Sequence, residues 1–363
     1  MPTVNVRLGK RSYSVHVLAG GLSRLGALCA ARFESRRAAL ISSPGVFRHH
    51  GKAAQRSLES AGYRLETLVV PDGERSKTPA RVVDLHNRLA RARLERADPL
   101  VVLAGGTLGD LAGFAAATYL RGVPLVHVPT TLMAQVDSAT GGKTGVNLAH
   151  GKNLVGAIWQ PGLVLCDPRV LSTLPPRQFR AGLAEVVKYG CIARPTLLGR
   201  LERELSKQGP VGEQELSRWI VESVRIKSDV VSRDESEQDL RRILNFGHTF
   251  GHALENATGY ARWLHGEAVA LGMVVALQLS ERCCGLDPRF SGRVTALLQS
   301  CFPRLDFPRV GWPTLERALG ADKKTRAGRA VWVLLEGPGK TVFLTPTSAA
   351  VRQSVERAHQ AWG

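Results

Sequence analysis

The sequence predicts an α/β domain with a mostly parallel sheet, followed by a mainly α-helical domain. Short apolar runs alternate with helical segments through the first half of the chain, as in a parallel sheet covered on both faces. The alternation ends at Leu174-Pro175-Pro176, and from Arg177 to about residue 320 the pattern is mostly helical. A length of 363 residues also suits two domains. We place them at residues 1–175 and 176–363.

The composition is that of an ordinary globular protein. Hydrophobic residues make up 44% of the chain and charged residues 22%, and no apolar run approaches the ~20 residues of a membrane helix. The N-terminal residues lack the apolar core of a signal peptide. The six cysteines form no CxxC pair, which argues against a zinc knuckle or a disulfide framework. We therefore expect a cytoplasmic protein with no membrane partner.

The formal net charge of +18 raises the possibility of a nucleic-acid partner. However, the arginines are scattered through segments such as 81–96 and 218–242, and aromatic residues are only 6% of the chain. We expect no nucleic-acid partner. The charge is interpreted as a solvated surface that also attracts small anionic substrates.

The predicted elements begin with a β-hairpin. Residues 3–8 and 12–18 alternate apolar and polar around Leu8-Gly9-Lys10-Arg11. Thr78 is placed to cap a helix over residues 79–93. The other predicted strands of this half are 38–41, 65–70, 100–104 and 125–128, and the other helices are 23–33, 50–61 and 110–120. Late in the chain, residues 331–335 and 341–344 predict a second hairpin, and a final helix begins near residue 348.

Two loops at predicted strand ends favour a Rossmann-like, nucleotide-binding first domain. Residues 104–110, Ala-Gly-Gly-Thr-Leu-Gly-Asp, join a strand to a helix whose first N–H groups can meet a phosphate. The pattern GGxxGD does not match GxGxxG, and such a turn also occurs without a ligand. Pro129-Thr130-Thr131 adds two hydroxyls at the end of the next strand, the edge at which open α/β sheets bind ligands.

Two glycine–lysine segments follow, at residues 137–144 and 151–154. The first is similar to a P-loop, but the GxxxxGK spacing fails because Asp137 stands five residues before Gly142. We reject a Walker A site. Lysines beside glycines still suit an anion, and an ordinary surface loop is the other interpretation.

Histidines are concentrated in the second half of the chain. His248 and His252 are four residues apart, so both imidazoles project from one face of a helix, and His265 follows closely. Three of the ten histidines in so short a span suggest a metal or an anion site, although histidines also occur as satisfied core residues. Glu185 and Lys188, three apart, fit either a partly buried ion pair or a carboxylate ligand beside a catalytic lysine.

Taken in order, the motifs closely resemble the 3-dehydroquinate synthase family. They are GGxxGD, VPTT, VDSxxGGKT, GKN, LAEVVKYG, LNFGHTFGHA, WLHGEAVA and DKK, and the match runs from about residue 70 to 345. The resemblance implies a dehydroquinate synthase-like fold and a carbon–oxygen lyase. It would convert 3-deoxy-D-arabino-heptulosonate 7-phosphate to 3-dehydroquinate and phosphate in the shikimate pathway. Transient oxidation by NAD, β-elimination of phosphate, reduction and aldol closure are the implied steps, with one divalent metal, Zn²⁺ or Co²⁺.

The resemblance also implies the site residues. Glu185, His248 and His265 match metal ligands, and this set leaves coordination positions open, as a catalytic Zn²⁺ requires. Positions that match cofactor-binding residues are Asp72, Gly73, Glu74, Arg75, Ser76, Lys77, Gly106, Thr107, Leu108, Gly109, Asp110, Thr130, Thr131, Lys143, Lys152, Val170, Leu171, Ser172 and Thr173. Positions that match catalytic or substrate-contacting residues are Asp137, Lys143, Lys152, Asn153, Lys188, Lys227, Arg241, Asn245, His252, Lys323 and Lys324. Arg121 matches a residue that reaches a neighbouring subunit's site, which implies a homodimer.

The sequence departs from the family pattern near the nucleotide. Ala104 replaces a glycine, and Thr107 replaces a common aliphatic residue. Ser42-Ser43 stands where many members carry an acidic or amide residue for the adenosine ribose. A hydroxyl holds a ribose diol less well than a carboxylate does, so we expect weaker NAD binding.

Three alternative functions follow from the same residues. Another sugar-phosphate cyclase would share the metal and NAD residues but alter the basic set for the substrate carboxylate, whereas Lys227, Arg241 and Asn245 are all present. A metal-dependent alcohol or glycerol dehydrogenase of the same fold would not need these anion-binding residues and would consume NAD stoichiometrically. A non-catalytic nucleic-acid binder would leave Glu185 and the histidines unexplained.

Overall fold

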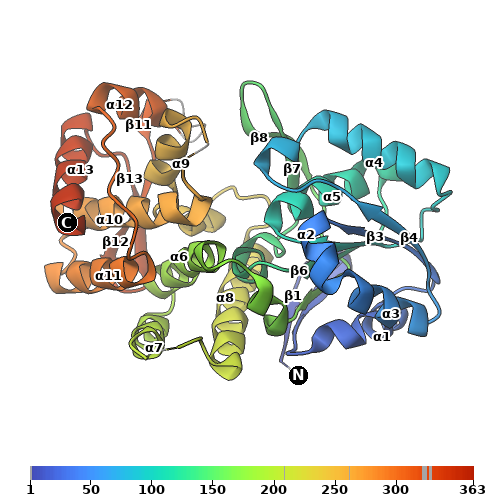
Figure 1. The fold of residues 1–363 in the computed structure, drawn as a ribbon. Coiled ribbons are helices and arrows are strands. Elements are labelled where there is room, and N and C mark those ends of the chain that lie inside the picture. Colours follow the sequence, from blue (N-terminus) through green and yellow to red (C-terminus); the bar gives the residue numbers. More distant parts are fainter. Residues whose placement is uncertain (1, 208, 261, 321–324, 327–328) are drawn as a thin grey trace. The chain divides into compact units, whose positions relative to one another are not determined.

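The chain forms two compact units in the computed structural model, which describes residues 2–207, 209–260, 262–320, 325–326 and 329–363 (Figure 1). Unit 1 comprises Met1–Pro175 and Gly212–Ser236, and unit 2 comprises Pro176–Val211 and Glu237–Gly363. A single boundary at 175 therefore gives only part of this division, because residues 212–236 pack with unit 1.

A sheet of seven strands forms the centre of unit 1. Its strands are β1 (Thr3–Val6), β2 (Tyr13–Val17), β3 (Arg37–Ser42), β4 (Arg64–Val69), β5 (Leu100–Ala104), β6 (Leu125–Pro129) and β9 (Leu163–Cys166). Their order is β1-β2-β9-β6-β5-β3-β4, with β1 antiparallel to β2 and the other neighbours parallel. The predicted mostly parallel sheet and the N-terminal hairpin are confirmed.

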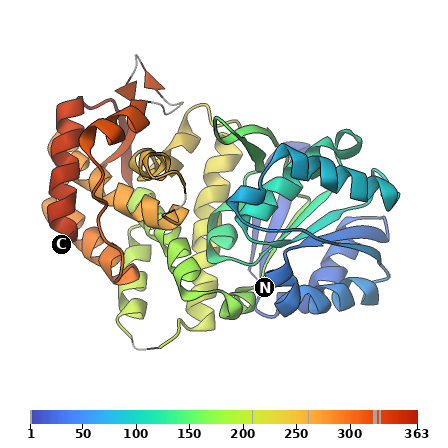
Figure 2. The ribbon, with the colours of Figure 1, turned by 45° about the horizontal axis from the view of Figure 1, so that its top comes forward.

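Helices cover both faces of this sheet. They are α1 (Leu25–Arg32), α2 (Pro44–Val46), α3 (Lys52–Ser60), α4 (Pro79–Arg91), α5 (Gly106–Thr118) and α8 (Glu213–Arg233). Helical turns are η1 (Gly9–Arg11), η2 (Gly21–Arg24), η3 (Phe47–Gly51), η4 (Glu74–Ser76), η5 (Tyr119–Arg121), η6 (Ala134–Ser138) and η7 (Pro168–Thr173). α1 and α3 pack together on one face, and α4 and α5 on the other (Figures 1 and 2). The central strands β5 and β6 are therefore buried throughout, which explains why β5 is continuously apolar and β6 is apolar except for His127. As predicted, Thr78 caps α4, its hydroxyl oxygen accepting from the Arg81 N–H at 3.3 Å.

A second, smaller hairpin is separate from the main sheet and packs against α5. It consists of β7 (Lys143–Leu148) and β8 (Gly151–Ile158), which pair antiparallel. Neither sequence interpretation of this segment, an anion-binding loop or a surface loop, anticipated these strands. A β-carbon on Gly156 would lie 2.1 Å from the Thr144 carbonyl oxygen. The glycines that obscured the strand pattern are thus the residues that let the two backbones approach.

Helix α8 belongs to unit 1 although unit 2 segments flank it in the sequence. It packs against β1, β2 and η6. Arg169 of η7 pairs with Glu213 at the start of α8, with Nε and Oε2 2.7 Å apart. Near the middle of the helix, Lys227 pairs with Asp137, with Nζ and Oδ1 2.7 Å apart. These long-range ion pairs help to explain why α8 packs with unit 1 and not with its sequence neighbours.

Unit 2 is mainly helical in its described residues, as predicted. Its elements are α6 (Pro176–Ile192), α7 (Thr196–Leu205), η8 (Leu240–Asn245), α9 (His248–Ala257), α10 (His265–Cys284), α11 (Pro288–Cys301), α12 (Trp312–Gly320), β10 (Thr325–Arg326), β11 (Arg329–Ala330), β12 (Trp332–Gly337), β13 (Lys340–Leu344) and α13 (Ser348–Trp362). Helix α10 is buried along most of its length and packs against α6, α9, α13 and β12, so it is the centre of this unit. β12 and β13 form the predicted antiparallel hairpin.

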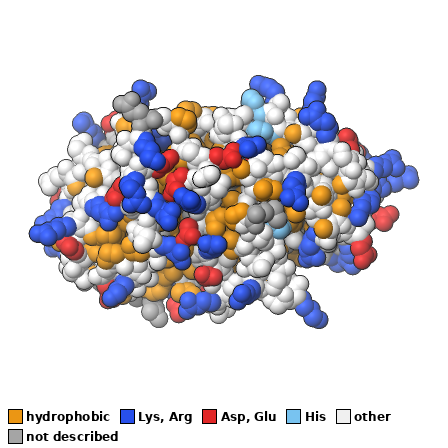
Figure 3. Space-filling view, turned by 90° about the horizontal axis from the view of Figure 1, so that it is seen from below, with side chains coloured by type: hydrophobic (Ala, Val, Ile, Leu, Met, Phe, Trp, Pro, Cys, Tyr) orange, Lys and Arg blue, Asp and Glu red, His pale blue; other side chains and the backbone are white. Residues whose placement is uncertain are grey.

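On the face shown in Figure 3, Lys and Arg side chains are dispersed among acidic and apolar ones. Within the described part of the chain, no helix combines the length and apolarity that crossing a membrane requires. The six cysteines are all unpaired.

Candidate functional site

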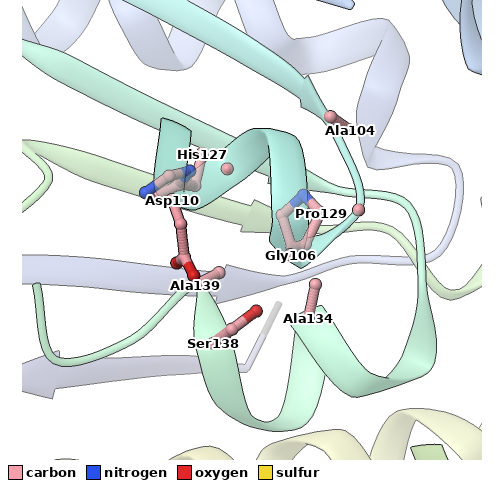
Figure 4. A pocket seen from close by; sticks show the side chains of 10 residues that line it. Ala104, Gly106, Asp110, His127, Pro129, Ala134, Ser138 and Ala139 are labelled. Carbon is pink, nitrogen blue, oxygen red and sulfur yellow. The ribbon is translucent and has the colours of Figure 1, made fainter. Parts of the chain in front are cut away.

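The glycine-rich turn joins β5 to the N-terminus of α5. Gly105 is extended (φ −72°, ψ 178°), so the chain enters the helix with its first N–H groups unused by the helix itself. The recess in front of the turn is lined by Ala104, Gly105, Gly106, Gly109, Asp110, His127, Pro129, Ala134, Ser138 and Ala139 (Figure 4). Ser138 points toward Gly106, where a β-carbon would lie 2.6 Å from its Oγ. Glycine at position 106 therefore keeps this space open.

The polar groups at this edge of the sheet differ in their surroundings. Thr130 Oγ1 and Ser138 Oγ are buried and have no hydrogen-bond partner among the described residues. Thr131 Oγ1 accepts from the Ala134 N–H at 3.1 Å and so caps the next helical turn. Since a buried hydroxyl without a partner costs free energy, Thr130 and Ser138 fit a recess that receives a polar ligand.

Lys77 connects three segments of the predicted nucleotide site. Its ammonium donates to Asp110 Oδ2 and to Asn153 Oδ1, each at 2.5 Å, and its side chain is buried. Asn147 donates to Glu74 Oε1 at 2.7 Å and accepts from the Asn153 N–H at 3.0 Å. The polar loop before α4, the start of α5 and the β7–β8 hairpin therefore meet at one place. Burial raises the pKa of Asp110, an effect that the Lys77 ammonium opposes.

Lys227 and Asp137, two predicted substrate positions far apart in sequence, are joined directly. The Lys227 ammonium donates to Asp137 Oδ1 at 2.7 Å and to its carbonyl oxygen at 2.8 Å. The Lys227 charge also acts on Asp110. A buried ammonium thus lies close to the nucleotide-site residues within unit 1.

Several predicted cofactor residues use their side chains locally. Ser172 Oγ donates to the Arg169 carbonyl at 2.8 Å, and Thr173 Oγ1 donates to the Val170 carbonyl at 3.0 Å, so both hydroxyls stabilise η7. Ser42, at the end of β3, donates to the Leu103 carbonyl at 2.7 Å and is fully buried. That hydroxyl is committed to the sheet and is a poor ribose ligand.

Three further basic positions lie at the surface of unit 1. Lys143 is exposed at the start of β7, and Lys152 is half-buried on β8. Arg121 is exposed at the end of η5 with a left-handed backbone (φ 63°).

In unit 2 the three predicted metal ligands converge. One ligand atom from each of Glu185, His248 and His265 lies within 4.8 Å of the others. They come from three helices: Glu185 from α6, His248 from the first residue of α9 and His265 from the first residue of α10. His248 Nε2 is 3.6 Å from Glu185 Oε1, and the His248 and His265 ring centroids are 5.2 Å apart.

The surroundings of Glu185 fit a divalent cation. Glu185 is fully buried, and neither carboxylate oxygen accepts a hydrogen bond of regular geometry from the described residues. The ammonium of Lys188, also buried, forms an ion pair with Oε2. Because a buried carboxylate is costly unless it is paired or binds a metal, the open side of Glu185 toward the histidines suits a cation. The ion pair that the sequence suggested is present, and it is compatible with the ligand interpretation.

His248 is held in the form that binds metals. Burial, together with the charge of Lys188, holds the pKa of His248 well below its usual range. Its Nδ1 lies 3.2 Å from the Phe246 carbonyl oxygen, so the neutral ring donates Nδ1–H to the main chain and turns Nε2 toward Glu185.

Close packing between helices places these side chains. A β-carbon on Gly272 of α10 would lie 1.9 Å from the Gly247 carbonyl oxygen, just before α9. One on Gly266 would lie 1.9 Å from the Ala181 carbonyl oxygen in α6. Gly247 itself has φ 80°, a conformation that favours glycine. Backbone contacts thus fix α10 against both helices that supply the other two ligands.

The other predicted residues of unit 2 that the structure describes lie near this cluster or in η8. The His252 ring centroid is 5.4 Å from that of His248 and 5.7 Å from that of His265. Arg241 is buried in η8, and Asn245 donates to Glu237 Oε1 at 3.1 Å. Lys323 and Lys324 lie outside the described residues.

Three residues of these sites were missed in the sequence. Glu255 Oε2 lies 3.2 Å from His265 Nδ1. The spacing of three from His252 was an available signal, since it places Glu255 on the same helix face. Glu237 contacts Asn245 but stands in an acidic turn that gave no signal. His127 is a lone histidine in an apolar strand, and its position in the recess follows only from the fold.

His127 should make the stability of unit 1 depend on pH. Burial lowers its pKa to about 4, whereas an unfolded histidine titrates near 6.5. Between these values the unfolded chain binds the additional proton, so stability is lost as the pH falls. From about pH 7.5 to about pH 5 we expect His127 to account for a loss of roughly 2 kcal/mol. Urea unfolding of wild type and His127→Gln at both pH values measures this. An equal loss in both proteins contradicts it.

Comparison with known proteins gives a consistent result. Family models described as 3-dehydroquinate synthase N-terminal and C-terminal match residues 67–181 and 182–325. A 3-dehydroquinate synthase of Symbiobacterium thermophilum is 46% identical over 360 residues, covering 97% of this chain and 99% of the relative. One from a Synechococcus species is 43% identical and covers 98% and 94%.

Solved structures of similar fold include two cyclases. A 2-deoxy-scyllo-inosose synthase complexed with carbaglucose-6-phosphate, NAD⁺ and Co²⁺ has a TM-score of 0.88 at 27% identity, covering 98% of this chain and 99% of that one. A 2-epi-5-epi-valiolone synthase from Streptomyces hygroscopicus with NAD⁺ and Zn²⁺ bound has a TM-score of 0.87 at 27% identity, covering 98% of each chain. A glycerol dehydrogenase from Schizosaccharomyces pombe, with a TM-score of 0.66 at 15% identity over 96% and 89% of the chains, shares the fold alone.

Proposed function

Since this chain belongs to the 3-dehydroquinate synthase family, we propose that it converts 3-deoxy-D-arabino-heptulosonate 7-phosphate to 3-dehydroquinate and phosphate. The observation that carries the proposal furthest is the convergence of Glu185, His248 and His265 from three helices. The relatives at 42–46% identity are all named for this activity, so a different cyclase or a dehydrogenase is not favoured.

We propose that Glu185, His248 and His265 hold one divalent metal ion, Zn²⁺ or Co²⁺. A carboxylate and two neutral imidazoles suit either ion and leave positions for substrate hydroxyls. When bound, the ion supplies Lewis-acid polarisation of those hydroxyls. The contribution of the chain is to keep His248 neutral and to hold the buried Glu185 carboxylate, whose Oε2 pairs with Lys188, with Oε1 facing His248.

NAD is proposed to bind at the glycine turn of unit 1. The N-terminus of α5 would receive the pyrophosphate, because N–H groups and the helix dipole converge there. Thr130 and Ser138 offer hydroxyls that have no hydrogen-bond partner in the described structure. Bound NAD supplies a hydride acceptor that is regenerated within the cycle. Lys77, fixed by Asp110 and Asn153, stabilises the walls of this recess.

The substrate's carboxylate and phosphate require cations. The proposed contacts to these two anionic groups are Lys227, Arg241, Lys143, Lys152 and His252. Arginine can bind either group in a bidentate geometry. Among the residues that the structure describes, no side chain stands out as the base for the elimination of phosphate. The phosphate oxygens of the substrate are therefore proposed to accept that proton.

A homodimer is proposed in which Arg121 reaches the site of the neighbouring subunit. Leu120 and Arg121 adopt consecutive left-handed conformations (φ 49° and 63°), and the Leu120 side chain is 44% exposed. An exposed leucine next to an exposed arginine suits a subunit interface. Sedimentation should show a dimer for the wild type and weakened association for Leu120→Lys. A monomeric wild type at micromolar concentration contradicts the proposal.

A cytoplasmic location is proposed from the cysteines. All six are unpaired, and Cys29, Cys166, Cys191 and Cys301 are buried as thiols. Cell fractionation tests the location, and recovery in a secreted fraction contradicts it.

A phosphate-release assay tests the function. The purified chain is given 3-deoxy-D-arabino-heptulosonate 7-phosphate with and without NAD, and with and without a chelator. Phosphate should appear only with NAD present and metal retained, and NADH should not accumulate. Stoichiometric NADH formation would indicate a dehydrogenase. Phosphate release at the same rate without NAD and with a chelator would overturn the proposal.

A further inference from the structure

We infer that Glu255 is a positioning residue for His265, and that its carboxylate selects the imidazole nitrogen offered to the metal. This rests on the proposed metal-ligand set. Glu255 Oε2 lies 3.2 Å from His265 Nδ1. The Glu255 side chain is 5% exposed, whereas that of His265 is 40% exposed. A buried, fixed acceptor therefore holds a more exposed ring.

The hydrogen bond determines the tautomer of His265. A neutral imidazole carries one N–H, and a carboxylate at hydrogen-bond distance from Nδ1 places that hydrogen on Nδ1. Nε2 is then the nitrogen with a lone pair for a cation. A carboxylate acceptor also makes the ring a stronger donor to a metal than a neutral acceptor would.

His248 reaches the same tautomer by a different route. Its Nδ1 lies 3.2 Å from the Phe246 carbonyl oxygen, and its Nε2 faces Glu185. The acceptor of His248 is thus main chain, which no substitution of a side chain removes. The acceptor of His265 is a side chain. Of the two Nδ1 hydrogen bonds, only the one to Glu255 can therefore be removed by mutation.

The fold explains why Glu255 can perform this role. It lies three residues after His252 and seven after His248, on the same face of α9. Gly251 lets α9 approach α10 closely, since a β-carbon there would lie 3.1 Å from the Ala268 carbonyl carbon. His265 is the first residue of α10, so the Glu255 carboxylate also lies near a helix N-terminus, where a negative charge is stabilised.

Glu255 could instead be a ligand of a second ion. One ligand atom from each of His252, Glu255 and His265 also lies within 4.8 Å of the others. A separation of 3.2 Å between Glu255 and His265 is already that of a hydrogen bond, and the metal-site interpretation requires His265 to be shared by two ions. The positioning role needs no second ion, and the number of ions bound per chain decides between the two.

The test measures Co²⁺ binding to the full chain after metal removal, by chelator competition and by the visible spectrum of the bound ion. Variants are Glu255→Ala, Glu255→Gln and His265→Ala. The matched control is Glu202→Gln, which removes the carboxylate that accepts from Arg293 in another part of unit 2. Glu255→Ala should weaken Co²⁺ binding by about 10- to 100-fold and alter the spectrum, with Glu255→Gln intermediate because an amide oxygen still accepts a hydrogen bond. The control should bind as the wild type does.

The outcomes separate this inference from the proposed ligand set. If His265→Ala binds Co²⁺ as tightly as the wild type, the ligand set is wrong and the inference falls with it. If His265→Ala weakens binding but Glu255→Ala and Glu255→Gln do not, only the inference is overturned. If the wild type binds two Co²⁺ ions per chain and Glu255→Ala binds one, Glu255 is a ligand of the second ion and the inference is overturned. In the His265→Ala background, Glu255→Ala should have no further effect on affinity, an outcome that general loss of structure would not give.

Discussion

Glu185→Gln should lose its metal ion and lower kcat for phosphate release by about 10³-fold or more. A Lewis acid supplies several kcal/mol of transition-state stabilisation, and about 4 kcal/mol corresponds to that factor. Glutamine has nearly the same size but offers a neutral oxygen. Glu185 is fully buried, and its Oε1 lies 3.6 Å from His248 Nε2, so the substitution removes the negative charge from the centre of the proposed ligand set. Metal content after gel filtration and single-turnover phosphate release measure the two effects.

The same variant leaves the buried Lys188 ammonium without its carboxylate partner. Breaking a buried ion pair on one side costs about 3–5 kcal/mol, so thermal unfolding must be measured alongside activity. Glu185→Asp separates the two causes, since it keeps the charge for Lys188 but withdraws the oxygens from the histidines. It should be more stable than Glu185→Gln and still deficient in metal. Full metal occupancy in Glu185→Gln would contradict the assignment of Glu185 as a metal ligand.

The strands and helices of unit 1 could be predicted because their pattern is local. β5 and β6 are buried on both sides, so their sequences are apolar apart from His127. Thr78 caps α4 with a side chain three residues from its partner. The β7–β8 hairpin could not be predicted in this way. Its glycines allow the two strands to approach closely, and the alternation of apolar and polar residues does not reveal that contact.

The sites show the same limit. The spacing of His248 and His252 suggested a metal or an anion site on one helix face, whereas the ligand group that contains Glu185 takes only His248 from that pair and adds His265. Only the resemblance to a family supplied that set in advance. The role of Lys77 as the contact of three segments, and the place of α8 in unit 1, depend on partners far away in sequence. Local patterns carry no information about such partners.

Gly272→Ala should destabilise unit 2 strongly. The new β-carbon would lie 1.9 Å from the Gly247 carbonyl oxygen and 2.9 Å from the Gly251 N. These are backbone atoms, which cannot rotate away as a side chain can. α9 and α10 would have to separate, and we expect a loss of about 3 kcal/mol or more, at the upper end of the cost of overpacking a core. Because His248 and His265 begin these two helices, the affinity for Co²⁺ should fall as well.

Gly292→Ala is the matched control for this prediction. Gly292 also lies within a helix, α11, but a β-carbon there meets no atom within 4 Å. Alanine has the higher helix propensity and restricts the unfolded chain, so this variant should gain about 0.5–1 kcal/mol with unchanged Co²⁺ affinity. Urea unfolding measures the stability of both variants. It is monitored by a signal from unit 2, such as the fluorescence of Trp332 in a chain without the other tryptophans. Both substitutions replace glycine with alanine. If one lowers and the other raises the free energy of unfolding, the difference must come from the contact between α9 and α10. A small effect of Gly272→Ala would mean that the helices can move apart at little cost and that their packing does not position the metal ligands.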